Sequence, residues 1–527
     1  MYIKDVNQFF LIHKKKKKEK MLRNKMGGIQ FSDITAMPQF AVVVLALALG
    51  LLPLLISYLS VRFHSVKQSN NNKKEKIPDG SMGFWPVLGE TFDFLKSHPS
   101  TSMGQFLEDR RSKYGDVFKS HLFGSPTIVS CDMEMNLFIL QNEGKLFRSS
   151  YPKSVSDILG SGSMLIVTGD QHKKVRSTAA NHIATSKSRP EFLNYVDKLS
   201  TSLMKSWQKL PRGEKVPFFQ VAKEFTMGVM LKNLIDMEPE DPLAPMFFND
   251  FLTFAKGFVS LPVYLPGSPY AKAVKARTRI SSTLRSIMED RKKRQSGDSV
   301  TSPSSSRGDF LDGLLKKEAM SDEEVVDLVR DLLLAGYETT SGLMGLVVYF
   351  LSQSPKALQH LREEHRKIRA EKPPGEPLNL KDYKQMEFTM KVINEALRCG
   401  NLVKFVHRKA VKDVEFKGYL IPQGWKVLPV LLSPHLDQSL HDHPTRFDPW
   451  RWEDEATIKK VMPFGAGARL CPGAEIARVE TSFFLHHLIL NYSWKIAEDE
   501  SPVVFPYLDF RRAMLLQIEP LEDNALN

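Results

Sequence analysis

Cysteine is scarce in this chain of 527 residues, which contains only Cys131, Cys399 and Cys471. No two of them form a Cys-x-x-Cys pair, so the sequence excludes a disulfide-rich scaffold and fits a protein body in a reducing compartment. There is no convincing internal repeat. With 42% hydrophobic and 25% charged residues, the composition is typical of a mostly globular protein.

Net charge is nearly absent from most of the chain. Residues 1–76 hold 14 Lys and Arg against 4 Asp and Glu, so they carry +10 of the total charge of +13. Because the positive charge lies in an N-terminal arm and not on a folded face, we expect no nucleic-acid partner. The five consecutive lysines Lys14–Lys18 indicate a solvated tail or an attraction to anionic lipid headgroups.

One long uncharged run follows the basic arm. The twenty residues Phe40–Leu59 are rich in Leu, Val and Ala, and this length matches a helix that crosses a bilayer. An amphipathic or buried helix is the competing interpretation. Both flanks are basic, so charge alone does not set the orientation. We therefore predict a basic arm (1–39), a transmembrane anchor (40–60), a linker with a proline-rich hinge (61–89) and a catalytic domain (90–527) with a mobile loop at about 292–308.

Near the C-terminus, Cys471 lies in the glycine-rich segment Phe464-Gly-Ala-Gly-Ala-Arg-Leu-Cys-Pro-Gly473. Glycines allow the backbone angles and the close approach that bring a sulfur to a metal on a tight loop. Backbone N–H groups of such a loop can stabilise a thiolate, and Arg469 is placed to pair with an anionic group. A buried free cysteine in an ordinary loop is the alternative.

The segment fits F-x-x-G-x-R-x-C-x-G and resembles the haem-binding signature of the cytochromes P-450. This resemblance implies haem b as cofactor, with Cys471 as the axial ligand of the iron and Arg469 beside a haem propionate. It also implies that Phe464, Gly467 and Gly473 shape the cofactor loop. The family's fold is mainly α-helical with a small β region, and we expect that fold here with one N-terminal transmembrane helix.

A second motif lies in a long apolar segment that begins near Asp322. The run Ala335-Gly-Tyr-Glu-Thr-Thr340 resembles the A-G-x-E-T-T signature of the family's distal helix. By that resemblance Thr339 hydrogen-bonds dioxygen and Glu338 helps to deliver protons, and Ala335 borders the substrate. Gly336 destabilises a helix relative to alanine, so we expect a neighbour to approach its backbone or the helix to bulge there.

Glu395 and Arg398 form an E-x-x-R pair on one predicted helix, which alone has little diagnostic value. The downstream run Phe447-Asp-Pro-Trp-Arg-Trp452 resembles the family's F-x-P-x-R element, which implies that Arg451 completes a buried Glu-Arg-Arg network. We expect this network to support folding and haem retention, not turnover.

Further basic residues match family positions for propionate binding. Arg408 follows the E-x-x-R helix, and Arg176 ends a run that resembles W-x-x-x-R with His172 in place of tryptophan, so the role of His172 stays open. By family position Val403 is a further pocket candidate, within Asn401–Phe405, and so is the segment Val155–Leu165.

Helical periodicity dominates from Phe92 to about Gly400, and strand-like pieces follow at Val411–Lys417 and Trp425–Leu432. The stretches Glu395–Tyr419 and Ile421–Pro429 closely resemble plant cytochromes P-450 that hydroxylate sterols at C-22 in brassinosteroid synthesis. Leu265–Tyr270 resembles the membrane-facing element of that group.

The resemblance therefore implies a monooxygenase of the endoplasmic reticulum membrane with a cytosolic catalytic domain and a hydrophobic sterol substrate. No segment resembles a flavin or nicotinamide domain, so we expect electrons from NADPH–cytochrome P-450 reductase, with Lys459 and Lys460 as candidate contacts. Alternatives are oxidation of another plant sterol, triterpenoid or diterpenoid, a reductase-independent haem lyase or isomerase, and a non-catalytic haem-binding protein.

Overall fold

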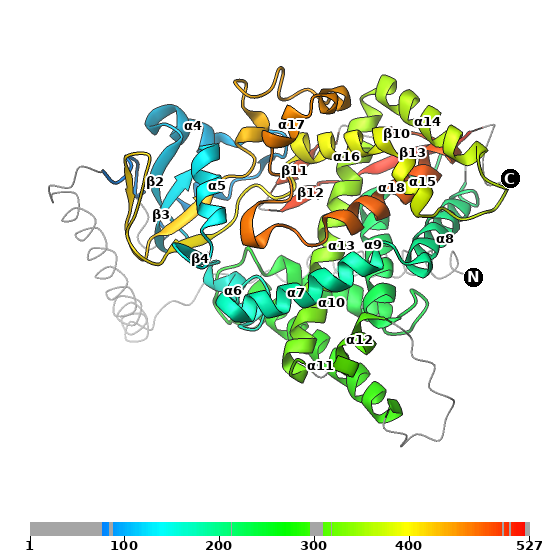
Figure 1. Cartoon of the computed structure of the whole chain (residues 1–527), viewed down its shortest axis with the longest axis horizontal. Coiled ribbons are helices and arrows are strands. Elements are labelled where there is room, and N and C mark those ends of the chain that lie inside the picture. The colour runs from blue at the N-terminus through cyan, green and yellow to red at the C-terminus, as the bar shows by residue number, and fades with distance from the viewer. Residues whose placement is uncertain are drawn as a thin grey trace, which may run out of the picture.

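The structure is a computed structural model that describes residues 76–83, 88–211, 213–295, 309–317, 319–497, 500–504 and 507–521. The predicted basic arm and transmembrane anchor lie outside the described residues. The same holds for most of the linker, for part of the hinge and for residues 296–308 of the predicted loop. The described chain is mainly α-helical with small β-sheets, as the sequence predicts (Figure 1).

Helices make up the larger part of the molecule. They are α3 (Thr91–Phe94), α4 (Gln105–Tyr114), α5 (Met133–Gln141), α6 (Lys153–Leu159), α7 (Gly169–Ser186), α8 (Pro190–Trp207), α9 (Phe218–Ile235), α10 (Ala244–Lys256), α11 (Pro269–Gln295), α12 (Phe310–Lys317), α13 (Asp322–Ser352), α14 (Pro355–Ala370), α15 (Leu380–Gln385), α16 (Glu387–Gly400), α17 (Ala456–Lys459) and α18 (Ala474–Asn491). Short 3₁₀ turns lie at Pro434–Leu436, Pro449–Glu453 and Gly467–Arg469.

The strands are short. They are β1 (His98–Pro99), β2 (Val117–Leu122), β3 (Ser125–Ser130), β4 (Phe147–Ser149), β5 (Lys215–Pro217), β6 (Arg408–Ala410), β7 (Val414–Phe416), β8 (Tyr419–Ile421), β9 (Lys426–Pro429), β10 (Tyr492–Ile496), β11 (Pro502–Val504), β12 (Leu508–Phe510) and β13 (Leu515–Pro520). The largest sheet has the order β2-β3-β9-β6-β4, with β3 and β9 parallel and its other pairs antiparallel. Its β4–β6 pair sets Ser149 opposite Arg408.

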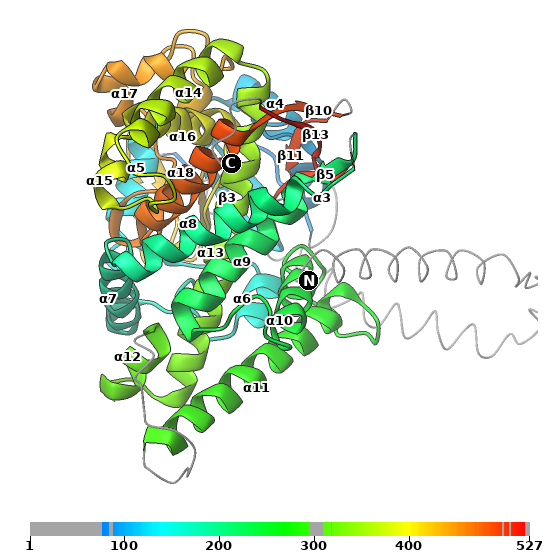
Figure 2. The same cartoon turned by 90° about the vertical axis from the view of Figure 1, so that its right-hand side faces the viewer.

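The helix α13 runs through the middle of the molecule, with α9, α11, α16 and α18 packed around it (Figures 1 and 2). Ser321 caps its N-terminus in a capping box with Glu324, and its first turn is acidic, which suits the positive end of the helix dipole. Among the described residues, only α13 has the length and apolar composition of a membrane span. Because 72% of its most apolar stretch is buried inside the protein, it is a core helix.

The structure adds early strands to the expected helix-rich region and corrects one boundary of the predicted loop. Strands are not confined to the region after Gly400, because β2 and β3 pair early in the chain and join the late strand β9. Residues 292–295, which the sequence assigns to a loop, continue α11 to Gln295. The pairing of β3 with β9 joins segments that lie far apart in the chain, so no local pattern signals it.

Candidate functional site

The loop that carries Cys471 is held close to α5. Gly467 has φ of +68°, and a Cβ at this position would collide with the backbone of Leu140. The Cys471 N–H donates to the carbonyl oxygen of Phe464 over 3.0 Å, which closes the turn. Glycine at 467 is therefore required both by the left-handed backbone conformation and by the close approach.

The sulfur of Cys471 lies at the start of α18. Its side chain has an open side, yet protein surrounds it elsewhere, so burial raises the pKa of the thiol above its ordinary value. Hydrogen bonds from the Gly473 and Ala474 N–H groups and the charge of Arg176 oppose that rise. A metal ion that binds the sulfur deprotonates it, and these donors then face a thiolate. Phe464 packs in the core with Arg478 4.8 Å above its ring centroid.

Two of the three arginines that the sequence assigns to propionates share one carboxylate, and the third contacts the cysteine loop. Arg469 Nε lies 2.9 Å from one oxygen of Glu143, and Arg408 Nε lies 2.7 Å from the other. Arg176 donates to the Leu470 carbonyl over 2.6 Å. Burial and the charges of Arg469 and Arg176 lower the pKa of His172 to about 4, so this residue shares the positive field of the cluster.

The charges of this cluster fit a haem. Among the described residues, Glu143 is the one carboxylate in ion-pair contact with Arg176, Arg408 or Arg469, so three guanidinium charges face a single negative charge. Two propionates would neutralise the surplus. Arg469 has committed four of its five N–H groups, to Glu143 and to the carbonyls of Met164, Leu165 and Val167. Arg176 and Arg408 thus keep most of the donors for a ligand.

The middle of α13 has an open face. Ala335 and Thr339 are exposed, one helical turn apart, on a helix whose neighbouring turns are buried. The Thr339 hydroxyl donates to the carbonyl of Ala335 over 2.7 Å. On another side of the helix, a Cβ on Gly336 would collide with Met230 of α9, so the expected close neighbour is present and the helix continues without a bulge.

Glu338 is paired with a residue that the sequence analysis misses. One of its carboxylate oxygens lies 3.0 Å from Nζ of Lys223 on α9, and that ammonium group lies 4.6 Å from the ring centroid of Phe219. Glu338 is thus held by an ion pair beside the turn that carries Thr339. Nothing in the local sequence around Lys223 signals this contact.

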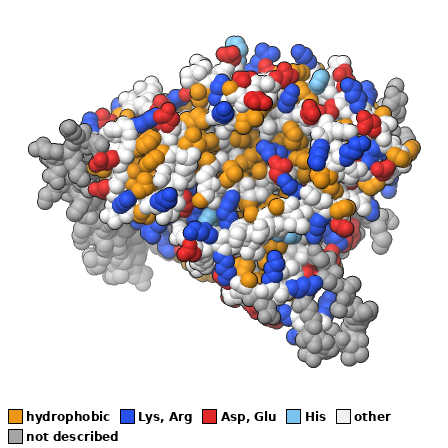
Figure 3. Space-filling model, viewed as in Figure 1, with side chains coloured by type: hydrophobic (Ala, Val, Ile, Leu, Met, Phe, Trp, Pro, Cys, Tyr) orange, Lys and Arg blue, Asp and Glu red, His pale blue; other side chains and the backbone are white. Residues whose placement is uncertain are grey.

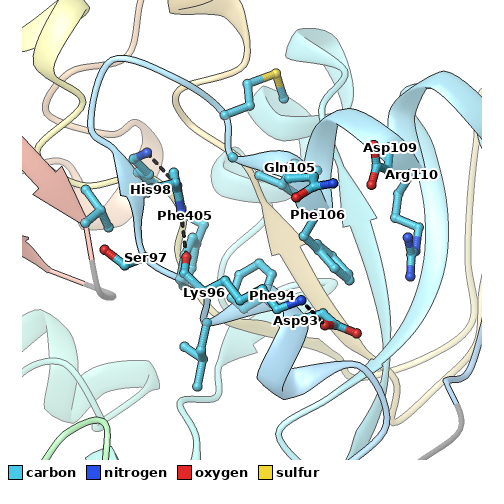
Figure 4. A pocket seen from close by; sticks show the side chains of 16 residues that line it. Asp93, Phe94, Lys96, Ser97, His98, Gln105, Phe106, Asp109, Arg110 and Phe405 are labelled. Carbon is cyan, nitrogen blue, oxygen red and sulfur yellow. Dashed lines mark hydrogen bonds and ion pairs between the residues drawn. The ribbon is translucent and has the colours of Figure 1, made fainter.

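The residues of the predicted pocket segment Asn401–Phe405 lie in two different environments. Val403 is 45% exposed, whereas Lys404 is buried and lines a different cavity of about 350 Å³ together with Phe405. Figure 4 shows the rings of Phe94, Phe106 and Phe405 in that cavity. Nζ of Lys404 lies 2.8 Å from His98 Nε2 and also donates to the carbonyls of Ser102 and Pro99, and burial lowers the pKa of Lys404 to about 7.

Glu395, Arg398 and Arg451 meet in the core. Arg398 forms a two-pronged pair with Glu395 at 2.9 and 2.8 Å, and Arg451 Nε lies 2.8 Å from the same carboxylate. Glu395 also accepts from the Asp448 N–H and the Trp452 indole, and Arg398 also donates to the carbonyls of His435 and Pro444. The network is therefore satisfied entirely by protein atoms.

Figure 3 shows hydrophobic side chains gathered in the middle of the face viewed in Figure 1, where the loop before α18 runs. Leu470 in this loop is 46% exposed.

Sequence reasoning missed Glu143. A lone acid after a helix carries no motif, and only the fold brings Glu143 to Arg408 and Arg469.

The family model described as Cytochrome P450 matches residues 78–521. A rice protein named Cytochrome P450 724B1 is 51% identical over 85% of this chain and 92% of its own length. A Paris polyphylla cholesterol 22-monohydroxylase, CYP90B52, is 43% identical over 89% of this chain and 98% of its own. A rice steroid (22S)-hydroxylase is 42% identical over 85% and 88%.

A solved structure agrees with these sequence matches. The retinoic acid-bound cyanobacterial CYP120A1 superposes with a TM-score of 0.73 at 26% identity, over 85% of this chain and all of the cyanobacterial one. The predicted fold is therefore confirmed for the described residues. The chain belongs to the cytochrome P450 family and is a monooxygenase.

Proposed function

We propose that this monooxygenase hydroxylates a sterol side chain at C-22, as a step of brassinosteroid biosynthesis. One observation carries the proposal: relatives that match 85–89% of this chain at 42–43% identity are named as 22-hydroxylases of cholesterol or of steroids. The rice protein at 51% identity has a name that states no substrate. The exposed apolar side chains of Ala335, Val403 and Leu165 suit a hydrophobic substrate.

The residues of the site have separate tasks in this proposal. Cys471 would ligate the haem iron, Phe464, Gly467 and Gly473 shape its loop, and Arg176, Arg408, Arg469 and His172 would hold the propionates. Haem b, when bound, supplies the capacity to accept electrons and activate dioxygen. Thr339 holds a hydroxyl at the open face of α13, and Glu338 holds a carboxylate one residue away, so a proton taken up from solvent by the carboxylate can be relayed past the hydroxyl at this turn.

The partners and location are part of the proposal. Electrons come from NADPH through NADPH–cytochrome P-450 reductase. Lys459 is exposed at the end of α17 and Lys460 follows it, so both are available to an acidic partner. The enzyme is anchored by residues 40–60 in the endoplasmic reticulum membrane, with its catalytic domain in the cytosol.

The test is reconstitution of the full chain with a plant reductase and a panel of sterols, with identification of products. A 22-hydroxylated product that requires NADPH and O2 is the expected result. Oxidation of all sterols only at other carbons, or of a triterpenoid or diterpenoid instead, contradicts the C-22 assignment. Product without NADPH indicates a lyase or isomerase, and substrate binding without turnover indicates a carrier.

A second oxidation at C-16 is the candidate that one relative favours. A Paris polyphylla protein that is 42% identical over 85% of this chain is named a cholesterol 16,22-dihydroxylase. The same product analysis separates a single from a double hydroxylation, because the two products differ by one oxygen in mass.

The role of Thr339 is tested by Thr339→Ala. We expect NADPH consumption to continue while most of it yields hydrogen peroxide instead of hydroxylated sterol. Thr339→Ser keeps a hydroxyl at this position and should retain coupled turnover, measured as product formed per NADPH consumed. Full coupling in Thr339→Ala would remove Thr339 from the proton path.

A further inference from the structure

The loop between α6 and α7, Gly160–Thr168, lies between the cysteine loop and α13. Arg469 donates to its carbonyl groups at Met164, Leu165 and Val167. The Leu165 side chain in this loop is 41% exposed, although the carbonyl of Leu165 also accepts from Ser149 over 2.6 Å. The backbone of the loop is thus fixed on one side by the haem-binding motif.

Its other side is fixed by α13, through residues that no motif predicts. The carboxylate of Asp331 accepts the Met164 N–H over 2.7 Å and a hydrogen bond from the Ser163 hydroxyl. Arg330, only 1% exposed, donates to the Leu159 carbonyl over 2.6 Å. Gly162 packs so closely on Asp327 that a Cβ would collide with the carboxylate. Asp327 and Asp331 therefore dock the loop on α13, and Arg330 holds the end of α6 from which the loop starts.

The docking point lies on the open face of α13. Asp331, Ala335 and Thr339 are spaced by four residues, so they lie along one face of the helix. Asp331 is 6% exposed, and its nearest cation, Arg330, is 3.7 Å away. Burial raises the pKa of Asp331 to about 6, but the carboxylate still prevails at neutral pH. The exposed Leu165 follows directly after the residue that Asp331 holds.

We propose that Asp331 is a positioning residue for substrate selectivity: by holding Ser163 and Met164 against α13, it sets where Leu165 borders the substrate, and thereby which carbon is presented for oxidation. The inference rests on the proposed sterol oxidation for its product readout, but the docking of the loop is measurable without turnover.

The experiment compares Asp331→Ala, Asp331→Asn and Leu165→Ala in the full-length holoenzyme. Hydrogen exchange of the Met164 amide is expected to accelerate on the order of tenfold or more in Asp331→Ala, because its acceptor is lost. The amide oxygen in Asp331→Asn still accepts, so exchange should stay within about threefold of the wild type. Leu165→Ala should leave this exchange unchanged, since it alters only an exposed side chain.

Product analysis completes the test. In Asp331→Ala and in Leu165→Ala we expect the ratio of 22-hydroxylated to other products to change, on the order of tenfold, while Asp331→Asn keeps the wild-type ratio. The matched control is Asp382→Asn. Asp382 is also a buried carboxylate that accepts a backbone N–H, from Asn379, beside a cation, Lys372, but it lies on α15 away from this loop. Its product ratio should equal that of the wild type.

The reduced CO spectrum of each variant reports an intact thiolate haem. Unchanged Met164 exchange in Asp331→Ala, or an unchanged product ratio in both Asp331→Ala and Leu165→Ala with that spectrum intact, would overturn the inference. If Asp331→Ala does not fold, Leu165→Ala decides by its product ratio. If the wild type makes no 22-hydroxylated product, the proposed function fails, whereas the exchange contrast between the two Asp331 variants still tests the docking.

Discussion

Two clusters in this molecule are built from ion pairs between arginine and glutamate, but they serve different purposes. Around Glu395, two guanidinium groups, an indole N–H and a backbone N–H converge on one buried carboxylate, and protein carbonyls take further arginine donors. Around Glu143, the carboxylate holds only two of three arginines, and much of their donor capacity is unused. In the first cluster protein atoms accept the arginine hydrogen bonds, so it serves the fold even though two guanidinium groups share one carboxylate. The second cluster has a larger positive surplus and keeps donors of Arg176 and Arg408 for a partner, so it serves an anionic ligand.

The largest effect should come from removing the sulfur of Cys471, which is proposed to bind the haem iron beside the second cluster. In Cys471→Ala we expect the thiolate-type spectrum of the reduced CO complex to disappear together with all turnover, because no other described cysteine lies in this loop. Cys131→Ala is the control, since Cys131 is buried beside β3 in a separate apolar cluster. An unchanged spectrum in Cys471→Ala would refute ligation.

The second largest effect is expected when Glu395, the carboxylate at the centre of the first cluster, is neutralised. Glu395→Gln leaves Arg398 and Arg451 without their shared counter-charge in the core, which typically costs about 3–5 kcal/mol of unfolding free energy. Denaturant unfolding and haem content of the purified protein measure this loss. The control Glu453→Gln removes an exposed partner of Lys391 and should change stability by less than about 0.5 kcal/mol. Equal stabilities of the two variants would mean that the buried network is dispensable.

A smaller effect is expected in the second cluster, and it should depend on the ligand. Glu143→Gln removes the carboxylate between Arg408 and Arg469, which should destabilise the haem-free protein by about 1–3 kcal/mol. Bound haem propionates supply negative charge in its place, so the holoenzyme should lose less. Thermal unfolding of both forms measures the difference. An equal loss in the two forms would show that the surplus charge is not directed at the ligand.

The smallest effect concerns pH and His172. The pKa of His172 is lowered from 6.5 to about 4, so the folded protein favours the neutral ring. The free energy of unfolding is therefore not reduced by His172 above pH 6.5. It falls as the pH drops from 6.5 through about 4, because the unfolded chain then binds a proton that the folded ring does not. His172→Gln should flatten this part of the acid-unfolding curve of the haem-free protein, followed by tryptophan fluorescence. An identical curve would show that the ring is not buried in the positive field.

Sequence reasoning succeeded where chemistry is carried by close spacing. Glu395 and Arg398 are one turn apart on any helix, and the residues from Phe464 to Gly473 close a single turn, so their local geometry follows from the backbone. The apolar segment that the sequence starts near Asp322 likewise matches the observed first residue of α13. These features depend on few residues and on no distant partner.

It failed where the partner comes from elsewhere in the chain. Nothing around Glu143, Lys223 or Asp331 indicates a role, because each acts on a group brought near only by packing of α5, α9 or the α6–α7 loop. The sequence also did not indicate which residues of Asn401–Phe405 are exposed and which are buried. A short irregular segment has no fixed period, so its neighbours decide that Val403 is exposed and Lys404 buried.

The sequence by itself determined the family, the cysteine in its turn, the long apolar helix with its Glu-Thr-Thr run and the residues of the Glu-Arg-Arg network, since motifs of fixed spacing encode them. Only the tertiary structure decided which acid holds Arg408 and Arg469, which cation holds Glu338 and which carboxylate docks the loop beside Leu165. The physical reason is that ion pairs and buried hydrogen bonds between distant segments depend on where the whole core places each backbone.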